Sequence, residues 1–234
     1  MRILVPSYGR ANHCPTLHKI PSAQVVVPNS QYSDYNKNYE GRVIGIDDDK
    51  DGCISKKRNA ILDLVEEGEL FWMLDDDLVS CTLLKQGEVD DIEQVLYRHW
   101  QCMVDMNCFF GGFNVTNDPV RYCEYAPFSR TKASYQAVCV KKCNLRYDEE
   151  LGGLEDCDYF VQVMNLKRQC FRDNRYFFEF PSNQTKSEIK QEGGIDYENN
   201  NTSEKLQKLR NKWGSIIKIK DGQSMGARVP INGA

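Results

Sequence analysis

The chain contains no long hydrophobic run, although 41% of its 234 residues are hydrophobic. A membrane-spanning helix needs about 18 to 20 consecutive apolar residues, and no stretch approaches that length. Residues 1–6 carry only a brief apolar run without a cleavage-like site, so they predict a first β-strand and not a secretory signal. We therefore expect a cytoplasmic protein without membrane contact. Nothing in the sequence indicates an obligate protein partner.

The ten cysteines form no recognisable framework. The closest pairs, Cys139 with Cys143 and Cys102 with Cys108, have no matching second pair, which argues against a zinc site. Without an export signal, free thiols in a reducing compartment are the simplest interpretation. The net charge of −4 likewise does not indicate a general binder of polyanions.

Short apolar runs alternate with helical patterns and predict an α/β fold with a mostly parallel sheet flanked by helices. Strands are expected at residues 3–5, 24–28, 43–46, 69–74, 109–115, 133–140 and 170–180. Helices are expected at residues 56–67, with Ser55 as N-cap, at residues 89–106, and after Gly152-Gly153. Within the second helix, His99 lies beside the apolar face, which favours a packed histidine over a catalytic one.

The length and composition favour one main domain with an appendage. We expect a catalytic domain at residues 1–180, a flexible polar loop at 181–204 and a basic C-terminal tail at 205–234. Between Lys205 and Arg228 the local charge is +6, in a chain of net −4. Such basicity indicates phosphate nearby, although a solubilising tail is an equally good interpretation.

The most informative stretch is residues 69–77, where an apolar run leads directly into Asp75, Asp76 and Asp77. In an open α/β sheet, ligands bind at the carboxyl ends of strands. Asp75 and Asp77 point to the same side if the chain stays extended, and such carboxylates suit Mg²⁺ or Mn²⁺. The alternative interpretation is a solvated acidic turn.

Polar turns follow two other expected strands. Residues 6–10 place an aromatic ring and a guanidinium after the first strand, where they suit stacking on a base and contact with phosphate. The alternative is an ordinary βα loop, which is favoured when this turn is taken alone. Residues 47–52 imitate the start of an EF-hand loop, but position 12 is Arg58 instead of glutamate, so we reject a calcium site.

A third group of acids, Glu155 and Asp156, follows the Gly152-Gly153 turn at an expected helix start. Acids in a first helical turn commonly just complement the helix dipole, and the functional alternative is a carboxylate presented beside the metal site. At this position, backbone N–H groups are expected to keep the pKa of Asp156 low.

In four segments the sequence resembles the GT-A-fold glycosyltransferases, which are nucleotide-sugar enzymes. Residues 6–10 (PSYGR), 52–60 (GCISKKRNA), 75–77 (DDD) and 154–156 (LED) are similar to that fold's P-x-Y-G-R turn and its R-N, D-x-D and E-D motifs. Within the fold, the short chain resembles compact phage enzymes of the TET-associated glycosyltransferase family. That family is linked to sugar transfer onto hydroxymethylated pyrimidines in DNA. The resemblance covers roughly residues 1–180.

The resemblance implies specific roles. Asp75 and Asp77 would hold Mn²⁺ or Mg²⁺ against the diphosphate of a UDP-sugar, and Asp156 would be the general base, with Glu155 as alternate. Donor binding is implied for Pro6, Ser7, Tyr8, Arg10, Asp47, Asp48, Lys56, Arg58, Asn59 and Asp76. The histidine that often completes the metal site is missing, because the chain's three histidines all lie in its first half.

The basic tail could close over the donor diphosphate or follow the backbone of a modified double-stranded DNA acceptor. The residues expected to make these contacts are Arg210, Lys212, Lys218 and Lys220. The setting that the resemblance implies is the cytoplasm of a phage-infected bacterium. A carboxylate base opposite the leaving group implies inversion at the anomeric carbon.

Three alternatives stay open from the sequence. A glycosyltransferase for a glycan or small molecule would share every donor motif. A nucleotidyltransferase would also be metal-dependent and α/β, but a glycine-rich phosphate loop would favour it and only Gly9 stands near the first strand. A non-enzymatic binding module would leave the two acid clusters unexplained.

Overall fold

The computed structural model describes residues 1–118, 122, 124–181, 202–218 and 226–227. Its main sheet has the strand order β3-β2-β1-β4-β9-β7-β10-β5-β6, with β8 paired to β10. The strands are β1 (Arg2–Pro6), β2 (Gln24–Pro28), β3 (Val43–Ile46), β4 (Leu70–Leu74), β5 (Ser80–Leu83), β6 (Gly87–Glu88), β7 (Phe110–Asn114), β8 (Phe128–Ser129), β9 (Ala137–Lys141) and β10 (Cys170–Glu179). A separate pair is formed by β11 (Ile217–Lys218) and β12 (Gly226–Ala227).

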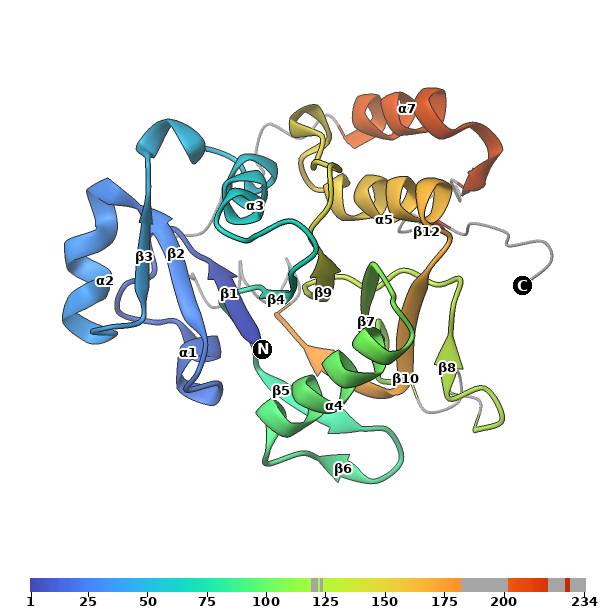
Figure 1. Ribbon diagram of the computed structural model, residues 1–234, viewed down its shortest axis with the longest axis horizontal. Coiled ribbons are helices and arrows are strands. Elements are labelled where there is room, and N and C mark those ends of the chain that lie inside the picture. Colours follow the sequence, from blue (N-terminus) through green and yellow to red (C-terminus); the bar gives the residue numbers. More distant parts are fainter. Residues whose placement is uncertain (119–121, 123, 182–201, 219–225, 228–234) are drawn as a thin grey trace.

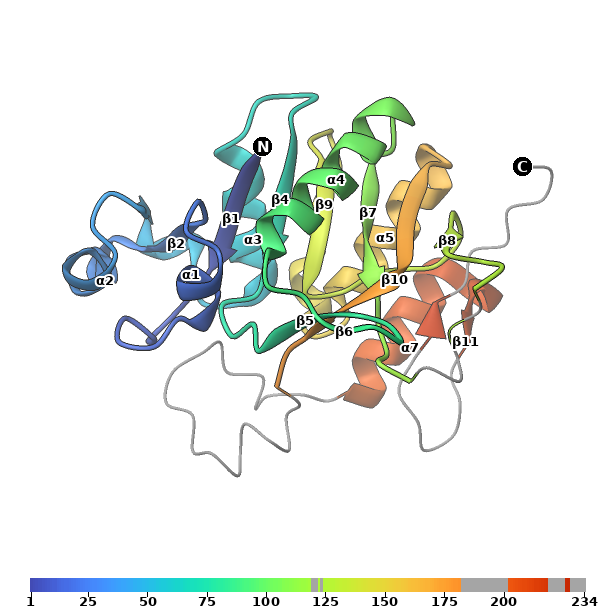
Figure 2. The ribbon, with the colours of Figure 1, turned by 90° about the horizontal axis from the view of Figure 1, so that it is seen from below.

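Helices cover both faces of this sheet (Figures 1 and 2). They are α1 (Pro15–Lys19), α2 (Tyr32–Asn38), α3 (Ile54–Asp63), α4 (Ile92–Asp105), α5 (Glu155–Leu166) and α7 (Thr202–Trp213). The core on the side of α3, α5 and α7 contains Phe71 and Met73. The core on the side of α1, α2 and α4 contains Trp72 and Leu74, because side chains alternate along a strand.

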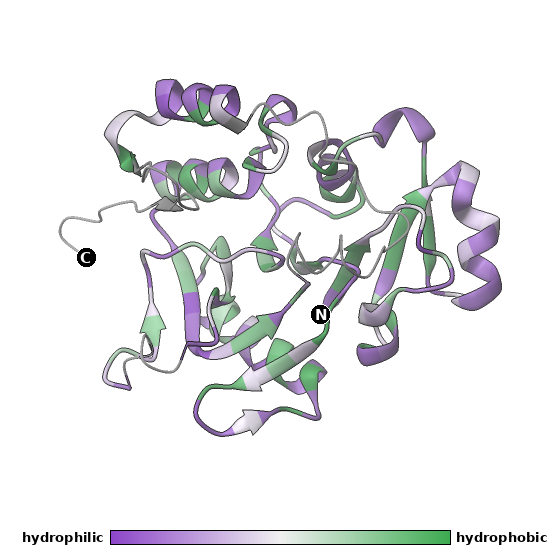
Figure 3. Cartoon of the chain, turned by 180° about the vertical axis from the view of Figure 1, so that it is seen from behind, coloured by the Kyte–Doolittle hydropathy of each residue, from purple (hydrophilic) through white to green (hydrophobic). Residues whose placement is uncertain are grey.

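The strands β3, β2, β1 and β4 pair in parallel, as β7 and β10 do, while β9 runs antiparallel between β4 and β7. The predicted α/β fold, a mostly parallel sheet flanked by helices, is therefore confirmed. Parallel pairing places the carboxyl ends of β1 and β4 side by side, so the polar segments that follow them meet at one edge. The strand residues are mainly hydrophobic, and the outer helices α2 and α7 are largely hydrophilic (Figure 3).

Several boundaries differ from the expected ones for local reasons. Helix α3 begins after Cys53, whose Sγ accepts a hydrogen bond from Lys56 N at 3.5 Å, so Ser55 lies inside the helix. The turn at Gly52, with φ of 102°, sets this earlier start. Strand β9 begins at Ala137 and not at residue 133, because Gln136 has a φ of 61° that interrupts the extended chain.

Other elements have no counterpart in the expectations: helix α1, the β5–β6 hairpin and helix α7. Helix α7 begins at Thr202, inside the range expected to be a polar loop; residues 182–201 lie outside the described part of the chain. All nine cysteines of the described residues are free. Across those residues, no helix has the length and apolarity needed to span a membrane.

The predicted packing of His99 is confirmed. Its ring lies among Trp72, Phe113 and Phe171, with ring-centre distances of 5.1, 4.8 and 4.9 Å. Gly111 makes room for it, since a Cβ there would lie 2.8 Å from His99 Cε1. Burial lowers the pKa of His99 to about 3, so the folded protein holds this ring neutral.

We predict that His99 makes the protein acid-sensitive. Its folded pKa lies below its unfolded value, so the unfolded state binds the extra proton and stability falls as the pH drops below about 6.5. Relative to His99→Leu, the parent should lose about 1.4 kcal/mol of unfolding free energy per pH unit there. Urea unfolding from pH 7.5 to 5.0 measures this difference. His18→Leu, at an exposed histidine, is the matched control. A parent and a His99→Leu variant with equal slopes would contradict the prediction.

Candidate active site

Hydrogen bonds hold the backbone around the three aspartates after β4 from two sides. Asp75 N donates to the carbonyl of Gln136 at 2.8 Å, next to β9. On the other side, Thr16 Oγ1 donates to the Asp75 carbonyl at 2.7 Å and accepts from Leu78 N at 3.0 Å. The aspartate backbone is therefore fixed before any ligand binds.

Arg58 joins this turn to the second acid cluster. Its guanidinium contacts Asp75 Oδ1 at 3.2 Å and Glu155 Oε1 at 3.0 Å, and it also pairs with Asp156. Arg58 is only 3% exposed. The structure thus brings together acids from two segments that are far apart in the sequence: the end of β4 supplies Asp75, the first turn of α5 supplies Glu155 and Asp156, and α3 supplies the arginine.

The electrostatics of this cluster raise the pKa of two of its acids. Burial raises the pKa of Asp75 to about 7 against the opposing charge of Arg58, and the carboxylates of Asp77 and Asp156 add to the rise. Burial likewise raises the pKa of Asp156 to about 6, opposed by Arg58 and reinforced by Glu155. The expectation of a low pKa for Asp156 is therefore wrong, because burial outweighs the helix start.

Asp76 points toward the opposite face of the sheet and is held inside the protein. It forms an ion pair with Arg10 and accepts a hydrogen bond from Ser7 Oγ at 2.5 Å. Burial raises its pKa, which Arg10 and Ser7 oppose. Donor contacts by Ser7, Arg10 and Asp76 stay predictions, and the structure shows these residues in an internal network.

Tyr35, on α2, completes that network, and no sequence signal singled it out. As a carboxylate, Asp76 can only accept, so Ser7 Oγ must donate to it. Ser7 Oγ can then only accept from the Tyr35 hydroxyl, 2.7 Å away. The Tyr35 oxygen in turn accepts from the backbone N–H of Arg10 at 2.8 Å. One buried hydroxyl therefore fixes both the side chain of Ser7 and the backbone of Arg10.

Lys57 supports the same segment from the other face of the sheet. It is fully buried, pairs with Asp51 at 2.9 Å and donates to the Ser7 carbonyl at 2.5 Å. Its Nζ lies 5.3 Å from the ring centre of Tyr8, which is 42% exposed. The sequence pointed to Lys56 at this position, but Lys56 is exposed and Lys57 is the residue that reaches the β1 turn.

Other expected donor-binding residues lie close to the β1 turn or hold neighbouring loops. Pro6 ends β1 and is buried. Asp48 Oδ1 accepts from the backbone and hydroxyl of Ser30, both at 3.0 Å, and Asp47 is exposed beside Lys50 at 3.5 Å. Asn59 exchanges hydrogen bonds with the backbone of Tyr147, which connects α3 to the segment before α5. Their donor contacts stay predictions.

The expected phosphate-binding residues of the tail divide into three groups. Lys212 forms ion pairs with Asp148 and Asp158, so its ammonium group already has two carboxylate partners within the protein. Arg210 is exposed on α7. Lys220 lies outside the described residues, and only the backbone of Lys218 is described.

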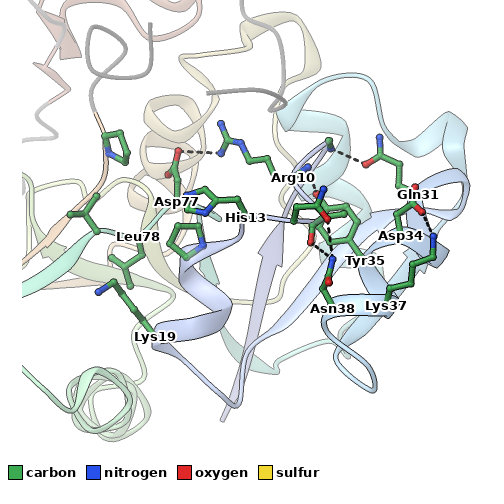
Figure 4. A pocket seen from close by; sticks show the side chains of 16 residues that line it. Arg10, His13, Lys19, Gln31, Asp34, Tyr35, Lys37, Asn38, Asp77 and Leu78 are labelled. Atoms are coloured by element: carbon green, nitrogen blue, oxygen red, sulfur yellow. Dashed lines mark hydrogen bonds and ion pairs between the residues drawn. The ribbon is translucent and has the colours of Figure 1, made fainter. Parts of the chain in front are cut away.

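A pocket of about 900 Å³ opens beside the aspartate turn. Its wall includes His13, Arg10 and Tyr35 of the internal network around Asp76, and Asp77, which pairs with Arg10 at 3.2 Å (Figure 4). Ligand pockets commonly have volumes of roughly 300–1,000 Å³, so a group of nucleotide size has room here.

Within the described residues, no group of three or more His, Cys, Asp or Glu side chains is arranged to hold a metal ion. The two expected ligands already have partners: Asp75 pairs with Arg58 and Asp77 with Arg10, both at 3.2 Å. Their metal role stays a prediction. Mg²⁺ is often bound by one or two carboxylates together with substrate phosphates and water. Among the described residues, the five carboxylates of residues 75–77, 155 and 156 lie in ion pairs with the guanidinium groups of Arg10 and Arg58. This excess of negative charge suits a divalent cation.

The family model for TET-associated glycosyltransferases matches residues 1–194. The chain belongs to the TET-associated glycosyltransferase family. It is therefore a glycosyltransferase, and this family implies a nucleotide-sugar donor. The match decides against the nucleotidyltransferase and the non-enzymatic binding module. No curated protein matches the chain.

Several solved structures are similar to this glycosyltransferase. A structure of S. aureus TarS residues 1–349 is 14% identical with a TM-score of 0.51, and the match covers 92% of this chain and 73% of that one. A longer TarS structure gives 15% identity and a TM-score of 0.49, covering 90% and 42%. A CMP:2-keto-3-deoxy-manno-octonic acid synthetase complexed with CTP gives 12% identity and 0.43, covering 81% and 95%. Only the first score exceeds 0.5, and at its low identity it shows the GT-A-like fold alone.

We predict that Tyr35→Phe destabilises this glycosyltransferase. The substitution leaves the buried Arg10 N–H without its acceptor and removes the donor to Ser7 Oγ, which still donates to Asp76. The unpaired N–H should lower the unfolding free energy by about 1–3 kcal/mol. Urea unfolding measures the loss. Tyr32→Phe, at an exposed tyrosine of the same helix, should change stability by less than about 0.5 kcal/mol. Equal losses of unfolding free energy in the two variants would show that the Tyr35 hydroxyl does not stabilise the fold.

Proposed function

We propose that the enzyme transfers a sugar from a UDP-sugar to a hydroxyl group, and that the acceptor is a hydroxymethylated pyrimidine in DNA. The observation that carries the proposal is the contact of one guanidinium, Arg58, with Asp75, Glu155 and Asp156. It draws the acid that follows β4 and the acids that open α5 into one site. A donor-binding group and a base within one cluster are what sugar transfer needs.

The donor nucleoside lies against the β1 turn in this proposal. Tyr8 offers an exposed aromatic face, and Lys57 and Tyr35 fix the backbone beside it. An aromatic ring held in place suits stacking on a base at low entropic cost. The pocket beside Asp77 leaves room for the rest of the donor.

Asp75 and Asp77 hold the divalent cation, Mn²⁺ or Mg²⁺, in this proposal. The residues fit such an ion, because burial and neighbouring carboxylates raise the pKa of Asp75 to about 7, and a nearby cation would relieve that repulsion. When bound, the ion would neutralise charge on the departing diphosphate.

Asp156 acts as the general base. Its carboxylate takes the proton of the acceptor hydroxyl, whose oxygen forms the new bond to the anomeric carbon. The bond from that carbon to the diphosphate oxygen breaks, and the nucleoside diphosphate leaves with the electron pair. Direct displacement of this kind inverts the anomeric centre. With a pKa of about 6, Asp156 is mostly ionised at neutral pH, as a base must be.

The DNA acceptor rests on the family's association and not on a contact. A glycan or small-molecule acceptor would use the same donor groups, so the acceptor must be decided by product analysis.

We predict that hydroxymethylated duplex DNA gains the mass of one sugar per modified base when incubated with the enzyme, Mn²⁺ and a panel of UDP-sugars. Mass spectrometry of the digested DNA measures the product. EDTA, Asp75→Asn and Asp77→Asn should each abolish transfer, because each removes the ion or one of its ligands. Asp105→Asn, at an exposed acid ending α4, is the control. Full activity in EDTA would overturn the metal role; sugar found only on glycan acceptors would overturn the DNA role.

We predict that Asp156→Asn lowers kcat by on the order of 10²–10⁴ while donor binding survives, because the variant keeps the shape but loses the basicity. Steady-state kinetics and calorimetric binding of UDP with Mn²⁺ separate the two effects. Glu155→Gln should have the smaller effect on kcat. A nearly normal kcat in Asp156→Asn would assign the base to another group.

A further inference from the structure

Helix α7 lies alongside α5 (Figure 1) and beyond the residues that the family model matches. Leu209 is fully buried in the same core as α5, and Trp213 packs against that core. The rest of the helix is hydrophilic apart from Leu206, and two of its residues, Arg210 and Lys212, are among the expected phosphate contacts. Its contacts indicate a different role.

The lysines of α7 meet one short segment, residues 148–158. Lys205 Nζ donates to the Gly152 carbonyl at 2.9 Å, in the turn that precedes α5. Lys208 pairs with the exposed Glu150 at 3.1 Å. Lys212 pairs with Asp148 at 2.8 Å and with Asp158 at 2.9 Å. This segment carries Glu155 and Asp156.

The contact with Asp158 has the greatest weight because this carboxylate is fully buried. Its Oδ1 accepts from Trp213 Nε1 at 2.6 Å, and its Oδ2 accepts from Lys212 at 3.0 Å and from Gln162 at 2.6 Å. A buried carboxylate that loses its partner is strongly destabilising, so these donors fix where Asp158 sits. Asp158 lies two residues after Asp156, in the first turn of α5.

We propose that α7 is a positioning element for the catalytic base: Lys212 and Trp213 hold the first turn of α5 through Asp158 and so keep Asp156 in place. The inference rests on the proposed role of Asp156. It makes Lys212 a positioning residue and not a phosphate contact. Lys205 and the buried Leu209 anchor the same helix, one at the Gly152 turn and one in the core.

Lys212→Met tests the proposal. We expect kcat to fall at least tenfold with the best UDP-sugar, while the donor KM and the affinity for UDP with Mn²⁺ change less than twofold. Lys208→Met is the matched control: it removes the same charge from the same helix but frees only the exposed Glu150. Lys212→Arg keeps a cation at this position and should restore at least half of kcat. If Lys212→Met does not fold, Trp213→Phe takes its place; it removes the Nε1 donor to Asp158 together with part of the ring, and it keeps an aromatic side chain against the core.

Hydrogen–deuterium exchange separates this inference from the proposed function, since it needs no turnover. Amides of residues 148–158 should exchange at least tenfold faster in Lys212→Met than in Lys208→Met. Faster exchange in Lys212→Met, found in a protein without transferase activity, would support α7 as a positioning element and would overturn only the proposed function. Equal exchange in the two variants would overturn the positioning role of α7. So would equal losses of DNA binding with unchanged kcat, because α7 would then be a general basic surface.

Discussion

The buried guanidinium of Arg58 is the interaction on which the site depends. Removing a cation from water is costly unless nearby carboxylates compensate, and Arg58 has three of them, Asp75, Glu155 and Asp156. The reverse also holds, because without this cation three carboxylates would lie together and burial would drive protons onto them. A planar guanidinium can donate to several acids at once, whereas a lysine ammonium is a single compact charge. The cluster therefore requires arginine and ties α3, β4 and α5 into one arrangement.

Neighbouring aspartates of the triplet have different partners. Asp75 faces Arg58, while Asp76 faces Ser7 and Arg10. Asp76 and Asp77 lie in the turn after β4, and Asp77 also pairs with Arg10, at 3.2 Å. The middle acid can thus brace the β1 turn without competing with Asp75 for the cluster around Arg58. Tyr35 then continues the brace into α2.

Much of the fold and part of the site could be predicted from the sequence, because these rest on local signals. Apolar runs gave the parallel strands, and acids directly after a run gave the position of Asp75. Tyr35 could not be found, since its role depends on a hydroxyl meeting Ser7 from 28 residues away. Helix α7 carries too few apolar residues to show a buried face, and its partners lie more than 50 residues earlier. The pKa of Asp156 was misjudged because a helix start is visible locally, while burial beside Glu155 is not.

The two halves of the site are supported independently. The half that we propose binds the donor rests on the β1 turn, which Tyr35 holds from one face and Lys57 from the other. The half that carries the proposed base rests on the first turn of α5, where Lys212 and Trp213 of α7 donate to Asp158. Arg58 and the pairing of β9 with β4 connect the halves, and Asp75 takes part in both connections through its side chain and its backbone N–H. Because each support reaches only its own half, a change in α2 acts first on the donor side and a change in α7 acts first on the base. A change at Arg58 or Asp75 reaches both halves directly.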